Sequence, residues 1–113
     1  MTAYKRGEII LVPFPFSNQS AIKKRPAVII SSDNYINTSS DVIIMAITSQ
    51  IQHISDIGER RLKDWKAEGL LKPSAIKSAV STLEQKLIVK KLGVLSTDDN
   101  DALNSALKEL LSL

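Results

Sequence analysis

The chain has 113 residues, of which 43% are hydrophobic and 24% are charged, and its formal net charge at pH 7 is +3. This is the composition of a globular protein, and it excludes a chain that is disordered throughout. The longest apolar run falls well short of the roughly 20 residues that a membrane-spanning helix needs, and the absence of cysteine excludes disulfides and thiolate chemistry. We therefore expect a single domain over residues 1–113, a cytoplasmic location and no contact with a membrane.

The first half of the chain predicts a sheet. Apolar runs of strand length occupy residues 9–12, 27–30 and 41–48. The first two bracket a polar connection, which is typical of a hairpin. The third is almost wholly apolar and β-branched, so we expect a central strand covered on both faces. Pro13 and Pro15 cannot donate ladder hydrogen bonds, so the first strand should end there. Residues 31–41, rich in Ser, Asp and Asn, predict a loop.

The second half is less regular. Residues 51–61 fit a loop or a short strand, residues 64–70 one helical turn closing on Gly69, residues 73–83 an extended segment, and residues 87–95 a strand or a short helix. Ser96 followed by Asp99 indicates a capped helix start, and an apolar stripe at helical spacing follows. The stripe comprises Leu103, Ala106, Leu107, Leu110 and Leu111. Strands first and helices later predict a mainly β (α+β) fold, a small curved antiparallel barrel with short helices and a C-terminal amphipathic helix.

Basic and aromatic residues gather around the hairpin connection. Phe14 and Phe16 follow the first strand, and Lys23, Lys24 and Arg25 precede the second. Such a grouping suits a single-stranded nucleic acid, because rings stack on bases and cations meet phosphates. The alternative is that the rings belong to the core and the cations to a solvated surface.

Several kinds of chemistry are poorly supplied. The chain has one histidine, no cysteine and no carboxylate pair at ligand spacing inside an apolar element, so we expect no metal and no cofactor. No glycine-rich loop could cradle a nucleotide phosphate. His53 is a formal candidate for proton transfer near neutral pH, or a surface histidine of no special role. Trp65 fits packing or a dimer contact better than base stacking.

Arg25 and Thr48 form the best candidate pair. Each lies at the end of a predicted strand, and if the two strands are neighbours, a guanidinium and a hydroxyl converge beside Gln50. Such a pair could hold a phosphodiester, and in RNA the 2′-hydroxyl is already present as a nucleophile. The alternative is that Arg25 forms a salt bridge and that Thr48 only ends its strand.

Several segments together resemble the MazF/PemK family of toxin ribonucleases from bacterial toxin-antitoxin pairs. They are RGEIILVPFPF at residues 6–16, KKRPAVIIS at residues 23–31, ITSQ at residues 47–50, LLKPSAI at residues 70–76 and LGVL at residues 92–95. The resemblance implies an SH3-like barrel, usually a homodimer. It also implies metal-independent, sequence-specific cleavage of single-stranded RNA (mRNA), leaving a cyclic phosphate and a 5′-hydroxyl.

By the same resemblance, the catalytic residues would be Arg25 and Thr48. RNA-binding residues would be Phe16, Ser17, Asn18, Gln19, Lys23, Lys24, Ser49 and Gln50. A cognate antitoxin would place a disordered, acidic tail in the same groove. The chain departs from many relatives in having no glycine in residues 17–24. Two non-catalytic alternatives remain: a barrel acting like the related gyrase poisons, and a module that binds nucleic acid or antitoxin.

Overall fold

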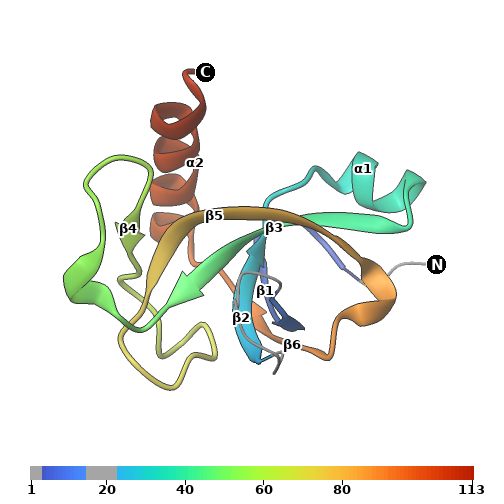
Figure 1. Cartoon of the computed structure of the whole chain (residues 1–113), viewed down its shortest axis with the longest axis horizontal. Coiled ribbons are helices and arrows are strands. Elements are labelled where there is room, and N and C mark those ends of the chain that lie inside the picture. Colours follow the sequence, from blue (N-terminus) through green and yellow to red (C-terminus); the bar gives the residue numbers. More distant parts are fainter. Residues whose placement is uncertain (1–3, 15–22) are drawn as a thin grey trace.

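The computed structural model describes residues 4–14 and 23–113. Within these residues six strands form one antiparallel sheet, in the order β4-β5-β3-β2-β1-β6. The strands are β1 (Glu8–Pro13), β2 (Lys24–Ile29), β3 (Asp41–Thr48), β4 (Arg60–Arg61), β5 (Ala75–Glu84) and β6 (Lys90–Val94). The sheet is strongly curled, with the helices α1 (Asp33–Thr38) and α2 (Thr97–Leu111) outside it (Figure 1). The predicted mainly β architecture is confirmed.

The predicted strands of the first half are confirmed. β1 and β2 form the expected hairpin, with Ile10 opposite Ala27, and β1 ends at Pro13. β2 also pairs with β3, where Ala27 lies opposite Ala46. β3 is the central strand that its apolar sequence predicted, since β2 and β5 flank it.

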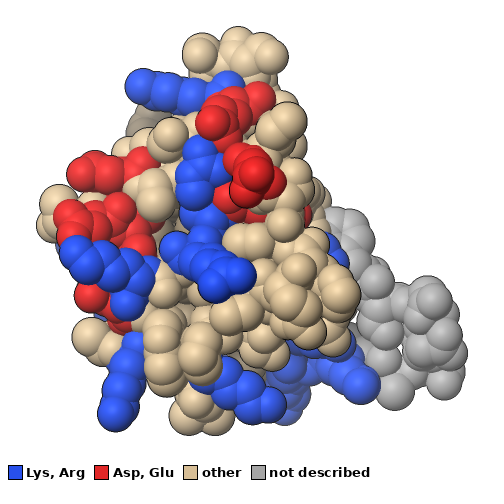
Figure 2. Space-filling model, turned by 90° about the vertical axis from the view of Figure 1, so that its left-hand side faces the viewer, with Lys and Arg blue, Asp and Glu red and all other residues tan. Residues whose placement is uncertain are grey.

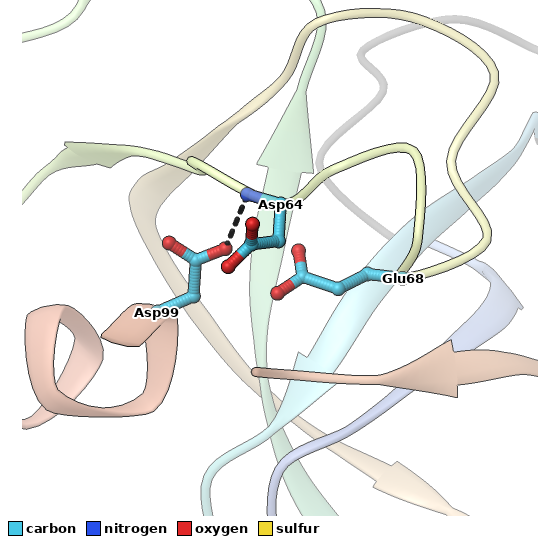
Figure 3. Close-up of side chains that lie close together, drawn as sticks. All are labelled: Asp64, Glu68 and Asp99. Atoms are coloured by element: carbon cyan, nitrogen blue, oxygen red, sulfur yellow. Dashed lines mark hydrogen bonds between the residues drawn. The ribbon is translucent and has the colours of Figure 1, made fainter. Parts of the chain in front are cut away.

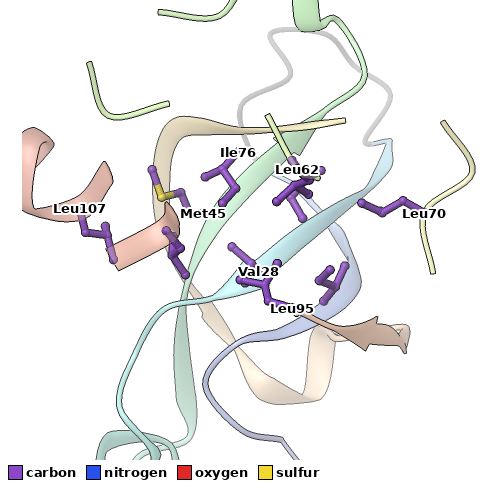
Figure 4. Close-up of a cluster of buried hydrophobic side chains, with 10 residues drawn as sticks. Val28, Met45, Leu62, Leu70, Ile76, Leu95 and Leu107 are labelled. Atoms are coloured by element: carbon purple, nitrogen blue, oxygen red, sulfur yellow. The ribbon is translucent and has the colours of Figure 1, made fainter. Parts of the chain in front are cut away.

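The alternation of side chains along the strands divides the core into two clusters, one on each face of the curled sheet. The first lies on the face covered by α2 (Figure 4) and comprises Ile9, Val28, Met45, Ile47, Leu62, Leu70, Ile76, Leu95, Leu103 and Leu107. The second includes a residue of α1 and comprises Ile10, Val12, Phe14, Ala27, Ile29, Ile36, Val42, Ile44, Leu83 and Ile88. Both faces of the central strands are therefore buried.

The predicted loop at residues 31–41 is wrong in part, because it contains α1. The hydroxyl of Ser32 accepts a hydrogen bond from the backbone N–H of Tyr35 at 3.1 Å and caps this helix. Small polar residues favour both turns and helix N-termini. Burial of Ile36 in the second core cluster decides in favour of the helix.

The remaining segments follow the predictions with shifted bounds. Residues 64–69 form the expected turn, with a bond from Glu68 N to Asp64 O at 3.0 Å and Gly69 at φ +91°, although the turn does not become a helix. The segment 87–95 holds the end of a 3₁₀ turn, η2 (Gln85–Leu87), and then β6. Another 3₁₀ turn, η1 (Ile51–His53), follows β3. Both alternatives considered for residues 87–95 are thus partly realised.

α2 begins and packs as predicted. The Ser96 hydroxyl accepts a hydrogen bond from Asp99 N at 3.2 Å, and Leu103 and Leu107 enter the first core cluster. Leu111, the last residue of the predicted stripe, is instead 55% exposed. None of the helices in the described part is both long and apolar enough to cross a membrane.

Candidate functional site

Strand register brings Arg25 and Thr48 together. The β2–β3 ladder ends with Ala27 opposite Ala46, and the same register extended by two residues would set Arg25 opposite Thr48. Directly opposed residues of an antiparallel pair project from the same face of the sheet. Both residues accordingly line one pocket of about 240 Å³.

The pocket has an apolar floor and a polar rim. Phe14, Ala46 and Ala79 contribute apolar surface, while Ser49, Gln50 and Lys77 contribute polar groups. Phe14 is only 3% exposed and belongs to the second core cluster. The ring of Phe14 is therefore part of the core beneath the pocket, and neither of its faces is open for a base to stack on.

A second pocket of about 490 Å³ shares Arg25 and Thr48 with the first. Its other walls include the apolar Leu71, which is 95% exposed, and the basic Lys72 and Lys90. Because Arg25 and Thr48 line both pockets, they lie where the two meet. A polymer passing from one pocket to the other would cross these two side chains.

The three cations at the start of β2 have no ion-pair partners among the described residues. Lys23, Lys24 and Arg25 are exposed, and none of the ion pairs formed within residues 4–14 and 23–113 involves them. The salt bridge considered for Arg25 is thus absent from this part of the chain. Figure 2 shows one face of the molecule. Acidic and basic side chains are mixed in its upper and middle parts, whereas the charged side chains along its lower edge are all basic.

The lining of both pockets is suited to an anion. Their described lining residues include no Asp, Glu, His or Cys. Cationic and neutral donors are what a phosphate group needs, whereas a metal ion needs oxygen, nitrogen or sulfur ligands of the missing kinds. The site geometry therefore offers a place for a phosphodiester.

A local turn fixes the Thr48 hydroxyl. Its oxygen accepts a hydrogen bond from the backbone N–H of Gln50 at 3.1 Å. This is the local side chain to backbone bond that Ser and Thr make at the ends of strands and in turns. The hydroxyl proton is left to be donated to a ligand, and the same turn sets Ser49 and Gln50 at the rim.

Glu59 fixes the segment of β5 next to Lys77. One oxygen of Glu59 accepts from Ser55 N at 2.7 Å, and the other accepts from both the backbone N and the hydroxyl of Ser78 at 2.9 Å. Burial by itself would raise the pKa of Glu59, but these hydrogen bonds and the charge of Lys77 outweigh it and lower the pKa. Glu59 thus stays ionised and fixes the part of β5 that carries Lys77.

Not every predicted residue can be placed. Phe16, Ser17, Asn18 and Gln19 lie outside the described residues. Lys23 and Lys24 are exposed at the start of β2, outside the lining of the two pockets as the described residues form them.

The two single-copy residues have positions away from the pockets. His53 is exposed in η1 and is not among the described residues that line either pocket, so nothing in its surroundings supports proton transfer at the site. Trp65 is half-buried against the first core cluster, which agrees with a packing role.

Three lysines of the site were missed from the sequence. Lys77, Lys72 and Lys90 come from β5, from the segment before it and from β6. Residues 73–83 were predicted to be extended, and side chains alternate between the two faces of such a segment. Only the pairing of β5 with β3, which follows from the fold, brings the face that carries Lys77 to Thr48.

Comparison with known families bears on this arrangement. Residues 5–111 match the model of a single family, described as the PemK-like, MazF-like toxin of type II toxin-antitoxin systems. The chain belongs to this family. The resemblance seen in five short segments of the sequence is thereby confirmed over nearly the whole length of this MazF-like toxin.

Solved MazF structures share the fold of this toxin. A mycobacterial endoribonuclease, solved in complex with its cognate antitoxin, matches with a TM-score of 0.80 at 17% identity, covering 98% of this chain and 97% of that chain. A MazF from Deinococcus radiodurans gives 0.75 at 16% identity and covers 100% of both chains. Mycobacterium tuberculosis toxin MazF-mt6 gives 0.73 at 19% identity over 94% and 97%. No curated protein sequence matches the chain.

Proposed function

We propose that this MazF-like toxin is a metal-independent, sequence-specific endoribonuclease that cleaves single-stranded RNA, including mRNA. The observation that carries the proposal is the meeting of Arg25 and Thr48, from adjacent strands, where two pockets join. The absence of acidic side chains among the described lining residues supports an anionic substrate.

Arg25 has the chemistry needed to stabilise the transition state. Attack of the ribose 2′-hydroxyl forms a new bond to phosphorus and breaks the bond from phosphorus to the 5′-oxygen. The guanidinium can donate two hydrogen bonds to the phosphoryl oxygens, where negative charge accumulates. Arginine is a poor base because its pKa exceeds about 12, so charge stabilisation is its main role and protonation of the leaving 5′-oxygen a secondary one.

Thr48 complements the guanidinium. Its oxygen accepts a hydrogen bond from Gln50 N, which fixes the side-chain rotamer. The hydroxyl is therefore already oriented to donate to a phosphoryl oxygen. The proton of the 2′-hydroxyl passes to solvent in this scheme, since the described lining residues include no carboxylate or imidazole to accept it. The products are a 2′,3′-cyclic phosphate and a 5′-hydroxyl.

The second pocket offers room for the bases and phosphates that flank the cut. Leu70, Leu71 and Leu92 form an apolar wall, and Lys72 and Lys90 lie at its border. Bases are bound through their flat apolar faces, and lysines attract the backbone phosphates. A flexible single strand can follow both pockets, whereas a stiff duplex would not enter them.

The proposed regulator is a cognate antitoxin whose acidic, disordered tail occupies the same groove, with the toxin acting as a homodimer. Solved structures of MazE with MazF from Deinococcus radiodurans and of the mycobacterial endoribonuclease with its antitoxin support such a partner. An acidic tail would find unpaired cations at this groove.

The test compares Arg25→Ala with Arg61→Ala. Arg61 is also an exposed strand arginine, but it lies in β4 and lines neither pocket. We expect Arg25→Ala to lose cleavage of single-stranded RNA while its circular dichroism stays unchanged, and Arg61→Ala to cleave normally. Undiminished cutting by Arg25→Ala would overturn the proposal. RNA binding by the wild type without any cutting would instead identify a non-catalytic binding module.

A further inference from the structure

Three carboxylates meet on the far side of the pocket wall. Asp64 and Glu68 belong to the turn before β5, and Asp99 belongs to the first turn of α2. One oxygen atom from each of the three lies within 4.8 Å of the others. Figure 3 shows the carboxylates of Asp64 and Glu68 directed toward that of Asp99. We call this group the acidic cluster.

Two of the three carboxylates of the acidic cluster are buried, and none of the three forms an ion pair within the described residues. Glu68 and Asp99 are each 2% exposed, and within the described residues no lysine or arginine forms an ion pair with any of the three carboxylates. The charge of Lys63 acts on Asp64 and Asp99 from a distance, but its Nζ forms an ion pair with the exposed Asp98 at 2.7 Å and not with the acidic cluster. Several uncompensated charges in a buried site are costly, so some positive species should join them.

Backbone N–H groups satisfy part of the cluster. Asp99 accepts from Lys63 N at 2.9 Å and from Asp64 N at 3.0 Å, one bond to each oxygen. Glu68 Oε2 accepts from Ser96 N at 2.8 Å. Glu68 Oε1 is different, because it is buried and has no hydrogen-bond partner among the described residues. Figure 3 shows the Glu68 carboxylate, which carries this oxygen, pointing toward the other two carboxylates, and a buried polar atom of this kind needs a partner.

We propose that the acidic cluster binds a divalent cation of the oxygen-preferring class, Mg²⁺, Ca²⁺ or Mn²⁺. Carboxylate oxygens are the ligands that these ions prefer, and the ions complete their shells with water. Asp64 is only half-buried, which leaves one side of the cluster open for water ligands. The site is separate from Arg25 and Thr48, and the proposal does not depend on the nuclease function.

A shared proton is the competing way to neutralise the pair. Burial and the neighbouring Asp99 raise the pKa of Glu68 to about 7, so a proton bound between the two carboxyl groups has to be distinguished from a cation. The two species differ in one respect that can be measured. A glutamine in place of Glu68 can imitate the protonated acid but supplies a much poorer cation ligand.

The bound cation would tie together three segments of the fold. The turn that holds Glu68 packs directly on β6, since a Cβ at Gly69 would lie 2.1 Å from Leu92 O. The same turn continues into Leu70 and Leu71, which wall the second pocket. The cation therefore joins the start of α2, the turn and, through them, the pocket wall. The sequence did not reveal this site because Asp99 lies far along the chain from the other two ligands.

Trp65, between two of the proposed ligands, provides a direct probe. Tb³⁺ occupies oxygen-ligand sites and emits when a nearby indole transfers its excitation energy. We expect the full chain, freed of metal with a chelator and then separated from it, to give saturable emission with one Tb³⁺ per chain that excess Ca²⁺ or Mn²⁺ displaces. The melting temperature should also rise with the concentration of CaCl₂, MgCl₂ or MnCl₂.

Variants decide the assignment. Glu68→Gln and Asp64→Asn should remain folded by circular dichroism and lose both the emission and the rise in melting temperature. Asp98→Asn, which removes an exposed carboxylate of the same helix, should keep both. Absence of saturable emission in the wild type, or an unchanged response in Glu68→Gln and Asp64→Asn, would overturn the proposal. No cation response together with a Glu68→Gln variant as stable as the wild type would identify the shared proton instead.

Discussion

The basic pocket and the acidic cluster are opposite in sign and in construction. At the pocket, Arg25 and its neighbouring lysines are exposed and lie at strand ends set by sheet register. In the cluster, Glu68 and Asp99 are buried and held by backbone N–H groups of a turn and a helix start. The first arrangement is open to a large polymer from solvent, whereas in the second one oxygen from each of three carboxylates lies within 4.8 Å of the others.

The difference shows how much an unpaired charge reveals about a ligand. An unpaired cation in water costs little, so the lysines beside Arg25, which form no ion pair within the described residues, are only modest grounds for RNA binding until the geometry of the site is added. A buried carboxylate oxygen without a hydrogen-bond partner is costly, so Oε1 of Glu68, which has none among the described residues, is a stronger indication of a ligand. Four predictions test the two regions and the turn around Gly69 that lies between them.

The largest effect is expected where the two regions touch. Gly69→Ala should destabilise the protein by at least about 3 kcal/mol, because the new Cβ would lie 2.1 Å from Leu92 O and φ is +91°. Gly7→Ala is the control, since its φ is +89° but its Cβ would lie 3.7 Å from Asn100 Oδ1, an ordinary contact. It should cost only about 1–2 kcal/mol. Equal losses in urea unfolding would show that the close approach of turn and β6 is unimportant.

Arg25→Lys should lower the rate of RNA cleavage about 100-fold, since lysine keeps the charge but cannot donate the paired hydrogen bonds of a guanidinium. Single-turnover rates on a saturating RNA measure this effect without the contribution of binding. Arg61→Lys, outside both pockets, should cleave at the wild-type rate. Cleavage by Arg25→Lys at the wild-type rate would mean that a positive charge is sufficient and that the paired hydrogen bonds of the guanidinium are not needed.

Glu59 is a buried carboxylate whose two oxygens both accept hydrogen bonds, in contrast to Glu68. Because the pKa of Glu59 is lowered in the folded state, its contribution is complete above the ordinary carboxyl pKa and is lost as the pH falls through the lowered value. Glu59→Gln should cost about 1–3 kcal/mol at pH 7. The loss should shrink in acid, which unfolding curves between pH 7 and roughly pH 3 would show. A loss independent of pH would mean that ionisation of Glu59 does not matter.

The smallest effect concerns the exposed lysines. Replacing Lys23 and Lys24 with alanine should weaken RNA binding evenly across sequences and reduce the slope of log K against log salt by about 0.7 for each phosphate that is no longer neutralised. Lys63→Ala is the control, because that lysine already pairs with Asp98. Fluorescence anisotropy at several salt concentrations gives both slopes. An unchanged slope in the double variant would mark these lysines as ordinary surface charges.

Local patterns predicted much of the fold and part of the site. The strands at residues 9–12, 27–30 and 41–48 and the helix capped by Ser96 follow from runs and spacings within single segments. The helix α1 was missed because its cap Ser32 and its residues Asp33 and Asn34 are of types that favour turns and helix starts equally well. Burial of Ile36 in the second core cluster favours the helix over the turn.

What the sequence could not provide is the meeting of distant segments. Arg25 and Thr48 were expected to converge only if their two strands were neighbours, and the β2–β3 pairing meets that condition. Lys77 reaches the pocket only through the β3–β5 pairing, and Lys90 only through β6, which pairs with β1 at the opposite edge of the sheet. The acidic cluster likewise needs the turn and α2 to pack together.

The most direct test of the central claim is to map the ends of the fragments from a long single-stranded RNA. The purified toxin is incubated with the RNA in excess chelator, at a temperature where circular dichroism shows the metal-free protein folded. We expect cuts at one short recurring sequence, with a cyclic phosphate on the upstream fragment and a 5′-hydroxyl on the downstream one, and no cuts by Arg25→Ala. Fragments bearing 5′-phosphates, or the same cuts from Arg25→Ala, would contradict the assignment.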